Sequence, residues 1–290
     1  MRNFDYAAPA TLADTVKLLA GQNGRARPLA GGTDLIDHVR TGRLAPDIVV
    51  DIKQVPELNI FEFGPQSLRL GAAVPCWRVY GSDAIKADYA ALADACMIIG
   101  GIQIQNRASV GGNLCNSGPA ADSTPALIAL GAVCVIAGAQ GSREVPVEQF
   151  CTGPGKNILQ PGELLVELRI PKPPANSGSH YRRFIPRNEM DIAVVGVGAS
   201  VVLDAAKQTI VSGRIGLGAV APTPLFAAAA SAALAGKPAT EATFRAAGEA
   251  ARQSISPIDD MRGTREFRLQ LTGVLVERVL TAAVERARSR

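Results

Sequence analysis

Along the first fifty positions, the pattern of apolar and polar residues predicts short strands that alternate with helices. Extended apolar runs predict strands at residues 4–6, 27–29 and 47–52. A helix is expected to start after Thr11, whose hydroxyl can cap it, and to end at Gly21. A second helix is expected over residues 34–41. The pattern therefore predicts a compact lobe in the order strand, helix, strand, helix, strand.

From residue 56 to residue 174 the pattern changes to paired strands and short helices. A hairpin is expected from the runs 59–63 and 68–72, and further strands are expected at 132–137, 144–147 and 164–170. Helical spacing of apolar residues occurs at 74–80, 89–99 and 126–130. The run Asp122-Ser123-Thr124-Pro125 is expected to cap the last of these helices. The proline-rich run 171–178 reads as a linker, and we place a domain boundary there.

Three long β segments followed by three helices account for the rest of the chain. The strands are expected at residues 181–185, 192–203 and 209–219, and the helices at 224–234, 241–254 and 264–287. This order predicts an α+β layer, in which helices cover a sheet. The apolar stripe of the last helix is expected to include Phe267, Leu271, Val274 and Leu275. The basic tail 286–290 is expected to be a solvated helix end.

The composition is typical of a globular protein and limits the kinds of partner that the protein is expected to bind. A chain of 290 residues with 47% hydrophobic and 19% charged residues exceeds what one core usually absorbs, so two domains are expected. The net charge of +4 is too weak and too dispersed to indicate nucleic acid as a partner. The start at 1–6 leads into no signal-peptide run, and the apolar run 226–234 is too short to span a membrane. A cytoplasmic protein without a membrane span is expected.

The cysteines and histidines do not suggest a metal site. The five cysteines are spread along the chain without a Cys-x-x-Cys pair, at Cys76, Cys96, Cys115, Cys134 and Cys151. Zinc and iron–sulfur sites need closely spaced ligands, so neither is expected in this chain. The two histidines, His38 and His180, are expected to be surface or core residues rather than catalytic bases.

Two glycine-rich turns of matching pattern carry the strongest chemical signal. They read Ala30-Gly31-Gly32-Thr33-Asp34 and Ala108-Ser109-Val110-Gly111-Gly112-Asn113. Paired glycines let backbone N–H groups approach a ligand, and hydroxyl and amide side chains add hydrogen bonds. Successive N–H groups form an anion site, which a following helix strengthens. The two turns could hold one pyrophosphate from both sides, although each also fits a tight turn chosen for geometry alone.

A dinucleotide-binding Rossmann unit is not expected. That unit needs Gly-x-Gly-x-x-Gly between its first strand and helix, and the first lobe contains no such run. The run Gly196-Val197-Gly198 lacks the third glycine and lies inside an apolar, strand-like segment. We therefore interpret it as packing.

With these features in place, the chain resembles the FAD-binding medium subunit of molybdenum hydroxylases, the xanthine dehydrogenase and carbon monoxide dehydrogenase family. The likeness spans nearly the whole chain, through the motifs at 28–35 and 106–113, then Asp122, then the run 181–193. The resemblance implies a two-lobed FAD-binding domain of the vanillyl-alcohol-oxidase (PCMH) type at residues 1–174, with lobes of about 1–55 and 56–174. It implies a carbon monoxide dehydrogenase flavoprotein C-terminal domain at residues 179–290, an α+β domain with a three-stranded sheet plus helices.

The resemblance also implies which residues touch the cofactor. Contacts to the pyrophosphate and the nearby ribityl or ribose groups would come from Leu29, Ala30, Gly31, Gly32, Thr33, Asp34, Leu35, Ser109, Gly112 and Asn113. Asp122 would accept a hydrogen bond from cofactor hydroxyls, and Leu165 would pack near the adenine or the ring system. Arg183 stands where family members often carry a lysine, so it keeps the positive charge with a different donor geometry. Ile99 stands where some relatives carry an aromatic residue against the flavin, which leaves the stacking partner open, with Tyr181 as one candidate.

The implied function is electron transfer. Flavin chemistry asks the protein mainly for orientation and electrostatics, so no catalytic acid or base and no metal ligand are expected here. The resemblance implies a large partner subunit whose molybdopterin cofactor hydroxylates the substrate, and a small iron–sulfur subunit whose [2Fe-2S] clusters relay electrons. FAD in this chain would pass the electrons to NAD⁺ or another acceptor. Two alternatives remain at this point: a self-sufficient FAD-dependent reductase of similar fold, and a cofactor-free scaffold or assembly subunit.

Overall fold

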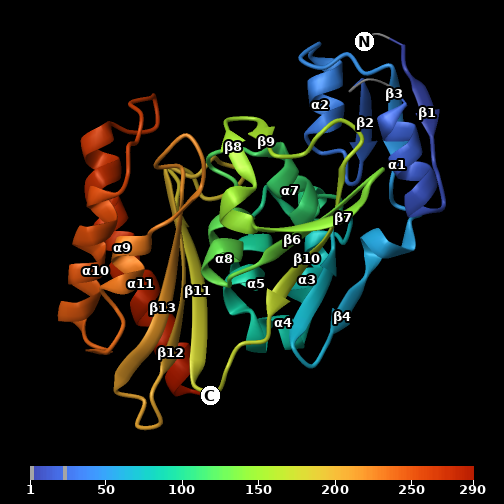
Figure 1. Cartoon of the computed structure of the whole chain (residues 1–290). Helices are drawn as coiled ribbons and strands as arrows, with labels where there is room; N and C mark the ends of the chain where they lie inside the picture. Colours follow the sequence, from blue (N-terminus) through green and yellow to red (C-terminus); the bar gives the residue numbers. More distant parts are fainter. Residues whose placement is uncertain (1–2, 22–24) are drawn as a thin grey trace.

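A small parallel sheet forms the first part of the computed structural model, which describes residues 3–21 and 25–290 (Figure 1). Its elements are β1 (Asp5–Ala7), α1 (Leu12–Ala20), β2 (Ala26–Leu29), α2 (Leu35–Arg40) and β3 (Ile48–Asp51), with β3 between β1 and β2. The predicted order of strands and helices is confirmed. The hydroxyl of Thr11 accepts a hydrogen bond from the backbone N–H of Asp14 at 3.1 Å, and Gly21 is the C-cap.

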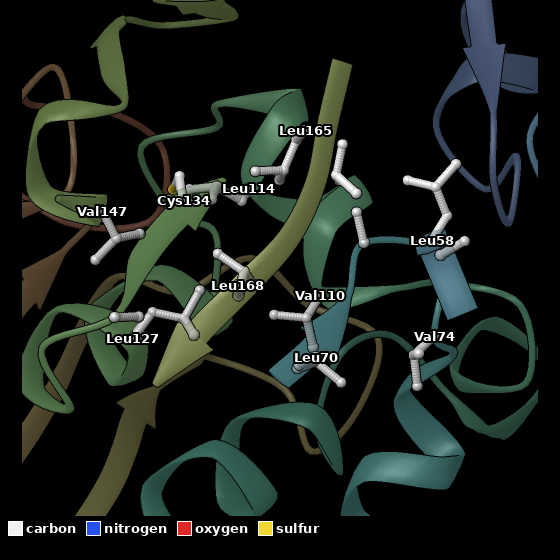
Figure 2. Close-up of a cluster of buried hydrophobic side chains, with 14 of the residues drawn as sticks. Leu58, Leu70, Val74, Val110, Leu114, Leu127, Cys134, Val147, Leu165 and Leu168 are labelled. Atoms are coloured by element: carbon white, nitrogen blue, oxygen red, sulfur yellow. The ribbon is translucent and has the colours of Figure 1, made fainter. Parts of the chain in front are cut away.

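A five-stranded antiparallel sheet forms the middle of the molecule. Its strands, in spatial order, are β4 (Phe61–Phe63), β5 (Ser67–Gly71), β10 (Leu164–Pro171), β6 (Val133–Gly138) and β7 (Gly141–Pro146). Around it lie η1 (Pro56–Asn59), α3 (Cys76–Gly81), α4 (Asp83–Asp88), α5 (Ala90–Cys96), α6 (Ile102–Gln105), α7 (Val110–Asn116), α8 (Ser123–Ala129), η2 (Val147–Gln149), β8 (Cys151–Gly153) and β9 (Lys156–Asn157). Figure 2 shows the core, in which Leu165 and Leu168 of β10 lie with Leu114 of α7 and Leu127 of α8. The strands predicted between residues 59 and 170 are therefore present.

A second antiparallel sheet forms the last part of the chain. Its long strands are β11 (Ser177–Phe184), β12 (Val195–Leu203) and β13 (Thr209–Gly218), and all three were predicted. β11 starts earlier than the predicted residue 181, inside the run 171–178 that was predicted to be a linker. Two short strands that the sequence did not predict pair with β13, namely β14 (Leu225–Phe226) and β15 (Lys237–Pro238). The expected helix 224–234 is wrong at its start, because Leu225 and Phe226 join the sheet and leave only α9 (Ala228–Ala232) as helix. The helices α10 (Glu241–Gln253) and α11 (Arg265–Arg288) follow as predicted.

Helices cover both faces of this sheet (Figure 1). The long helix α11 packs on β11 and β12, while α5 and α8 of the middle unit pack on the other face. A Cβ on Gly198 would lie 2.6 Å from the carbonyl oxygen of Pro125, and one on Gly216 would overlap the same oxygen. Helix α8 therefore touches the strand backbones directly. The interpretation of Gly196-Val197-Gly198 as packing is confirmed at Gly198.

The apolar stripe predicted for α11 is only partly correct. Leu275 is buried, but Phe267 and Val274 are 40% and 37% exposed. The buried face lies further along the helix, at Leu275, Val276, Val279, Leu280, Ala283, Val284 and Ala287. The reason is the close approach of β11, where a Cβ on Gly178 would overlap the carbonyl oxygen of Ala283. The sheet contact is therefore made by the second half of the helix.

The basic C-terminal tail is docked, which corrects the expectation of a solvated helix end. Arg286 binds the carboxylate of Asp94 on α5 through two nitrogens, at 2.7 and 3.0 Å. Arg290 forms an ion pair with Asp88 and donates to the carbonyl of Ala87. These contacts hold α11 against the middle unit.

Among residues 3–21 and 25–290, no helix combines the length and apolar character that crossing a membrane requires. The start of the chain at Met1 and Arg2, which entered the expectation about a signal peptide, lies outside the described residues.

Candidate functional site

A cavity of about 1220 Å³ lies where the first lobe meets the middle unit, and it reaches the end of β11. Both glycine turns line it, together with the segment between β9 and β10 and the residues that follow β11. Pockets for drug-sized ligands usually measure about 300–1,000 Å³. The cavity is therefore large enough for an extended ligand of nucleotide size or more.

The two glycine turns touch each other at the cavity. A Cβ on Gly31 would overlap the carbonyl group of Arg107 and lie 2.9 Å from the backbone nitrogen of Ala108. Gly32 has a φ of 76°, a conformation that residues with a side chain rarely adopt. The structure thus brings both turns to one cavity, and only glycine at position 31 allows the approach.

Ser109 and Gly112 shape the second turn. The hydroxyl of Ser109 caps α7 by accepting a hydrogen bond from the backbone N–H of Gly112 at 3.0 Å. That N–H group is engaged, so Gly112 contributes to the cavity by its lack of a side chain. A Cβ on Gly111 would lie 2.5 Å from the carbonyl oxygen of Ala72, which explains the first glycine of the pair as packing.

Asn113 is oriented by the neighbouring helix. Its Oδ1 accepts hydrogen bonds from the backbone N–H of Ser123 at 3.3 Å and from the Ser123 hydroxyl at 2.6 Å. A backbone N–H can only donate, so the amide oxygen must face Ser123. Among the hydrogen bonds of the described residues none uses Nδ2 of Asn113, so this group can donate to a ligand in the cavity.

Asp122 does not cap α8, which corrects the sequence expectation. Its Oδ1 accepts a hydrogen bond from the Tyr181 hydroxyl at 2.7 Å, and its Oδ2 pairs with Nη1 of Arg183 at 2.6 Å. Burial raises the pKa of Asp122 to about 6, although the charge of Arg183 and the hydroxyl of Tyr181 act to lower it. Burial also raises the pKa of Tyr181 well above its usual value. Through its bonds to Tyr181 and Arg183, Asp122 connects β11 to the start of α8.

Tyr181 does not fit the stacking role considered for it. It is 3% exposed, packs with Ala91, Ala95 and Ala126, and is not among the residues that line the cavity. In the described part of the chain no Phe, Tyr or Trp lines the cavity, and its large apolar side chains are aliphatic, among them Ile99, Ile104 and Ile192. A planar ring bound in the cavity would contact aliphatic side chains.

The remaining candidate residues fall on the cavity wall with one exception. Ala30, Thr33, Asp34, Leu35 and Leu165 all line the cavity, as does the Arg183 head group. Leu29 does not, because its side chain packs beneath the turn, with Cδ1 at 2.8 Å from the Cβ position of Gly32. Its expected role as a contact residue is thus not supported by its placement.

Part of the wall was not anticipated from the sequence. Gly155 and Gly162, with φ values of 68° and 85°, frame a segment that contains β9, leads toward β10 and lines the cavity. Within it, Nδ2 of Asn157 donates to the carbonyl oxygen of Cys115 at 2.9 Å and so fastens β9 to the end of α7. The local signals for this segment were Gly153-Pro154-Gly155 and Pro161-Gly162. Asp191 and Ile192 also line the cavity. They lie in the run 181–193 that carries the resemblance, but no role was predicted for them.

The cavity carries binding groups and lacks an evident nucleophile. Cys115 lines it, but burial raises the pKa of its thiol to about 12, which makes the thiolate scarce near neutral pH. Within the described ranges, no group of three His, Cys, Asp or Glu side chains is arranged to hold a metal ion. The glycine turns, the Nδ2 donor of Asn113 and the buried guanidinium of Arg183 fit a large anionic ligand such as a dinucleotide.

Comparisons with known proteins agree with this geometry. The family model of the FAD binding domain in molybdopterin dehydrogenase matches residues 2–173, and that of the CO dehydrogenase flavoprotein C-terminal domain matches residues 180–283. The chain is 34% identical over 289 residues to the carbon monoxide dehydrogenase medium chain of Afipia carboxidovorans, covering 99% of this chain and 98% of that protein. It is also 34% identical over 289 residues to the xanthine dehydrogenase FAD-binding subunit of Escherichia coli O157:H7, covering 98% of each.

A solved structure extends the comparison to the fold. The reconstituted CO dehydrogenase from Oligotropha carboxidovorans contains a chain that matches with a TM-score of 0.94 at 31% identity, covering 98% of this chain and 99% of that chain. The resemblance found from the sequence motifs is confirmed, and so is the two-part fold that it implied. This chain belongs to the family of FAD-binding medium subunits of molybdenum-containing dehydrogenases.

Proposed function

We propose that the chain binds FAD in the cavity, with the diphosphate between the turn at 30–34 and the start of α7. The observation that carries this proposal is the direct contact of Gly31 with Arg107, which puts both glycine turns on one cavity. Asn113 would donate through Nδ2, and Gly112 would leave room for the phosphate oxygens. FAD would supply the redox chemistry, and the protein would supply its position and charge environment.

The proposed role is electron transfer within a larger assembly. A small subunit with [2Fe-2S] clusters would deliver electrons to the flavin, and a large subunit with the molybdopterin cofactor would oxidise the organic substrate. The flavin would pass the electrons to NAD⁺ or to another acceptor. The relatives named as medium chain and as FAD-binding subunit support this assignment.

The direct test is titration of the apoprotein with FAD, beside the variant Asn113→Asp. This variant keeps the oxygen that faces Ser123 and replaces the Nδ2 donor by a second carboxylate oxygen. A hydrogen bond to a charged group contributes about 1.5–3 kcal/mol, so its loss alone should weaken FAD binding about ten- to a hundredfold, and repulsion adds to this. The thermal stability of the apoprotein serves as the control for folding.

Three outcomes separate the alternatives. Stoichiometric FAD uptake, together with the loss in Asn113→Asp, supports the proposal. A colourless protein that takes up no FAD contradicts it and favours a cofactor-free scaffold. Turnover of a small substrate with NAD(P)H, in the absence of any partner subunit, contradicts the electron-transfer role and favours a self-sufficient reductase.

A further inference from the structure

Arg183 is a buried guanidinium in the cavity wall, and its side chain is only 6% exposed. Its Nη1 donates to Oδ2 of Asp122 at 2.6 Å, and Oδ1 of the same carboxylate accepts from the Tyr181 hydroxyl at 2.7 Å. Among the hydrogen bonds of the described residues, Arg183 uses only Nη1. Its Nε and Nη2 groups are therefore available to a ligand in the cavity.

Gly196 makes this arrangement possible. It lies on β12 directly opposite Arg183, and a Cβ there would lie 2.7 Å from the hydroxyl oxygen of Tyr181. The missing side chain leaves the space in which the phenol reaches Asp122. Gly196, Tyr181 and Asp122 thus form a continuous support behind the Arg183 head group.

The part of the cavity at Arg183 suits a flat ring. Met190, in the loop after β11, has its Sδ 3.4 Å from the Cβ position of Gly101, so this loop touches the loop that contains Ile99. Ile99 and Ile192 from these two loops line the same cavity as Arg183. A planar apolar group with a polar edge, bound between these loops and Arg183, would meet aliphatic side chains and a cation.

We propose that Tyr181 and Gly196 are positioning residues which, through Asp122, hold the Arg183 guanidinium toward the flavin ring, where its charge favours the reduced flavin. This inference rests on the proposed binding of FAD. Two electrons and one proton, delivered by the reductant, convert the neutral oxidised ring into an anion. A fixed cation in a desolvated site stabilises that anion more than the neutral ring.

The test measures the two-electron midpoint potential of FAD bound to the full chain, by equilibration with a redox dye, beside the affinity for oxidised FAD. In Arg183→Gln the ratio of affinities for reduced and oxidised FAD should fall about tenfold, which is a drop of about 30 mV. In Tyr181→Phe the ratio should fall about threefold, and Gly196→Ala should act in the same direction. Arg183→Lys, which keeps the charge, should restore the ratio to within about twofold of the wild type.

A double variant distinguishes positioning from a general structural effect. If Tyr181 acts through Arg183, the variant that combines Tyr181→Phe with Arg183→Gln should have the potential of Arg183→Gln alone. Arg182→Gln is the matched control, because Arg182 is the exposed neighbour on the same strand and should leave the potential unchanged.

Two results would overturn the inference. The first is an unchanged potential in Arg183→Gln with FAD still bound, and the second is equal weakening of oxidised and reduced FAD, which would place Arg183 at the diphosphate. Either result leaves the proposed function intact. Failure of the wild-type chain to bind FAD would instead remove the proposed function itself.

Discussion

Glycines bring two backbones together at two places in this molecule, with opposite results. At the first place, Gly31 lies against the carbonyl group of Arg107, and the space beside this contact is the cavity. At the second, Gly198 and Gly216 lie against the carbonyl group of Pro125, inside a fully packed contact between α8 and the last sheet. At both places glycine is required because a Cβ would come too close to the carbonyl group of the facing backbone.

The neighbouring residues make the difference. Thr33, Ser109 and Asn113 surround the first contact and line the cavity with polar groups. Ala126 and Ile128 lie beside the second contact and are fully buried. A glycine run therefore indicates close backbone approach, and the polarity of the adjacent residues indicates whether a ligand or a core fills the space.

Gly31→Ala should have the largest effect on the cofactor. The new Cβ would overlap the backbone of Arg107, so the two turns must move apart. Overpacking of this kind costs about 1–3 kcal/mol or more, and FAD affinity should fall about a hundredfold if that cost is taken from binding. The measurement is FAD titration, with Gly81→Ala as the control because no atom lies within 4 Å of the Cβ position there. Unchanged affinity would contradict the role of the first contact.

The pH dependence of stability tests the burial of Asp122, which lines the cavity and directly precedes α8. Its pKa is raised to about 6 by burial, so folding favours the protonated carboxyl. This contribution is complete below the ordinary pKa of 3.8 and is lost as the pH rises through about 6. Relative to Asp122→Asn, the apoprotein should lose on the order of 2 kcal/mol of unfolding free energy between pH 4 and pH 7. Urea unfolding at several pH values measures it, and a flat difference would be inconsistent with the burial argument.

Gly198→Ala should act on stability and spare the cofactor. Its Cβ would lie 2.6 Å from the carbonyl oxygen of Pro125, so α8 and β12 would have to move apart. The free energy of unfolding should fall by about 2 kcal/mol. FAD affinity of the folded protein should remain unchanged, which is the reverse of the result expected for Gly31→Ala. If both variants lose affinity equally, the distinction between the two regions fails.

Arg286→Ala should have a smaller effect, at another contact between the middle unit and the last part of the chain. It removes two hydrogen bonds from Asp94 and leaves that carboxylate with His180 and the backbone N–H of Tyr181. Because Arg286 is partly exposed, the loss should be about 1–2 kcal/mol. Thermal unfolding of the single variants and of the double variant with Asp94→Ala isolates the coupling between the two side chains. A coupling energy near zero would show that the docked tail contributes little.

Periodicity predicted most of the fold because the elements are local. The order of strands and helices in the first lobe, the central strands and the long helix α11 all follow from spacing over a few turns. The short strands β14 and β15 were not predicted, because each forms by pairing with β13 and its own two residues carry no strand pattern. The buried face of α11 was misplaced for the same reason, because the position of β11 decides it.

The candidate site was partly readable from motifs. Both glycine turns and Asn113 carry polar and flexible residues at short range, and they line one cavity. The partners of Asp122 lie 59 and 61 residues away along the chain, and Arg286 lies 192 residues from Asp94. A local sequence pattern could not predict hydrogen bonds over such separations. Whether each wall residue touches FAD stays a prediction.

The docked tail has a mechanical consequence. Arg286 and Arg290 are fastened to helices of the middle unit, and α8 packs against the backbones of β12 and β13. The final third of the chain is therefore held to the middle unit at two separate places. An electron donor seated on one side and an acceptor on the other would then face each other across a constant gap. The tunnelling distance would be set once, at folding, and each turnover would use the same path.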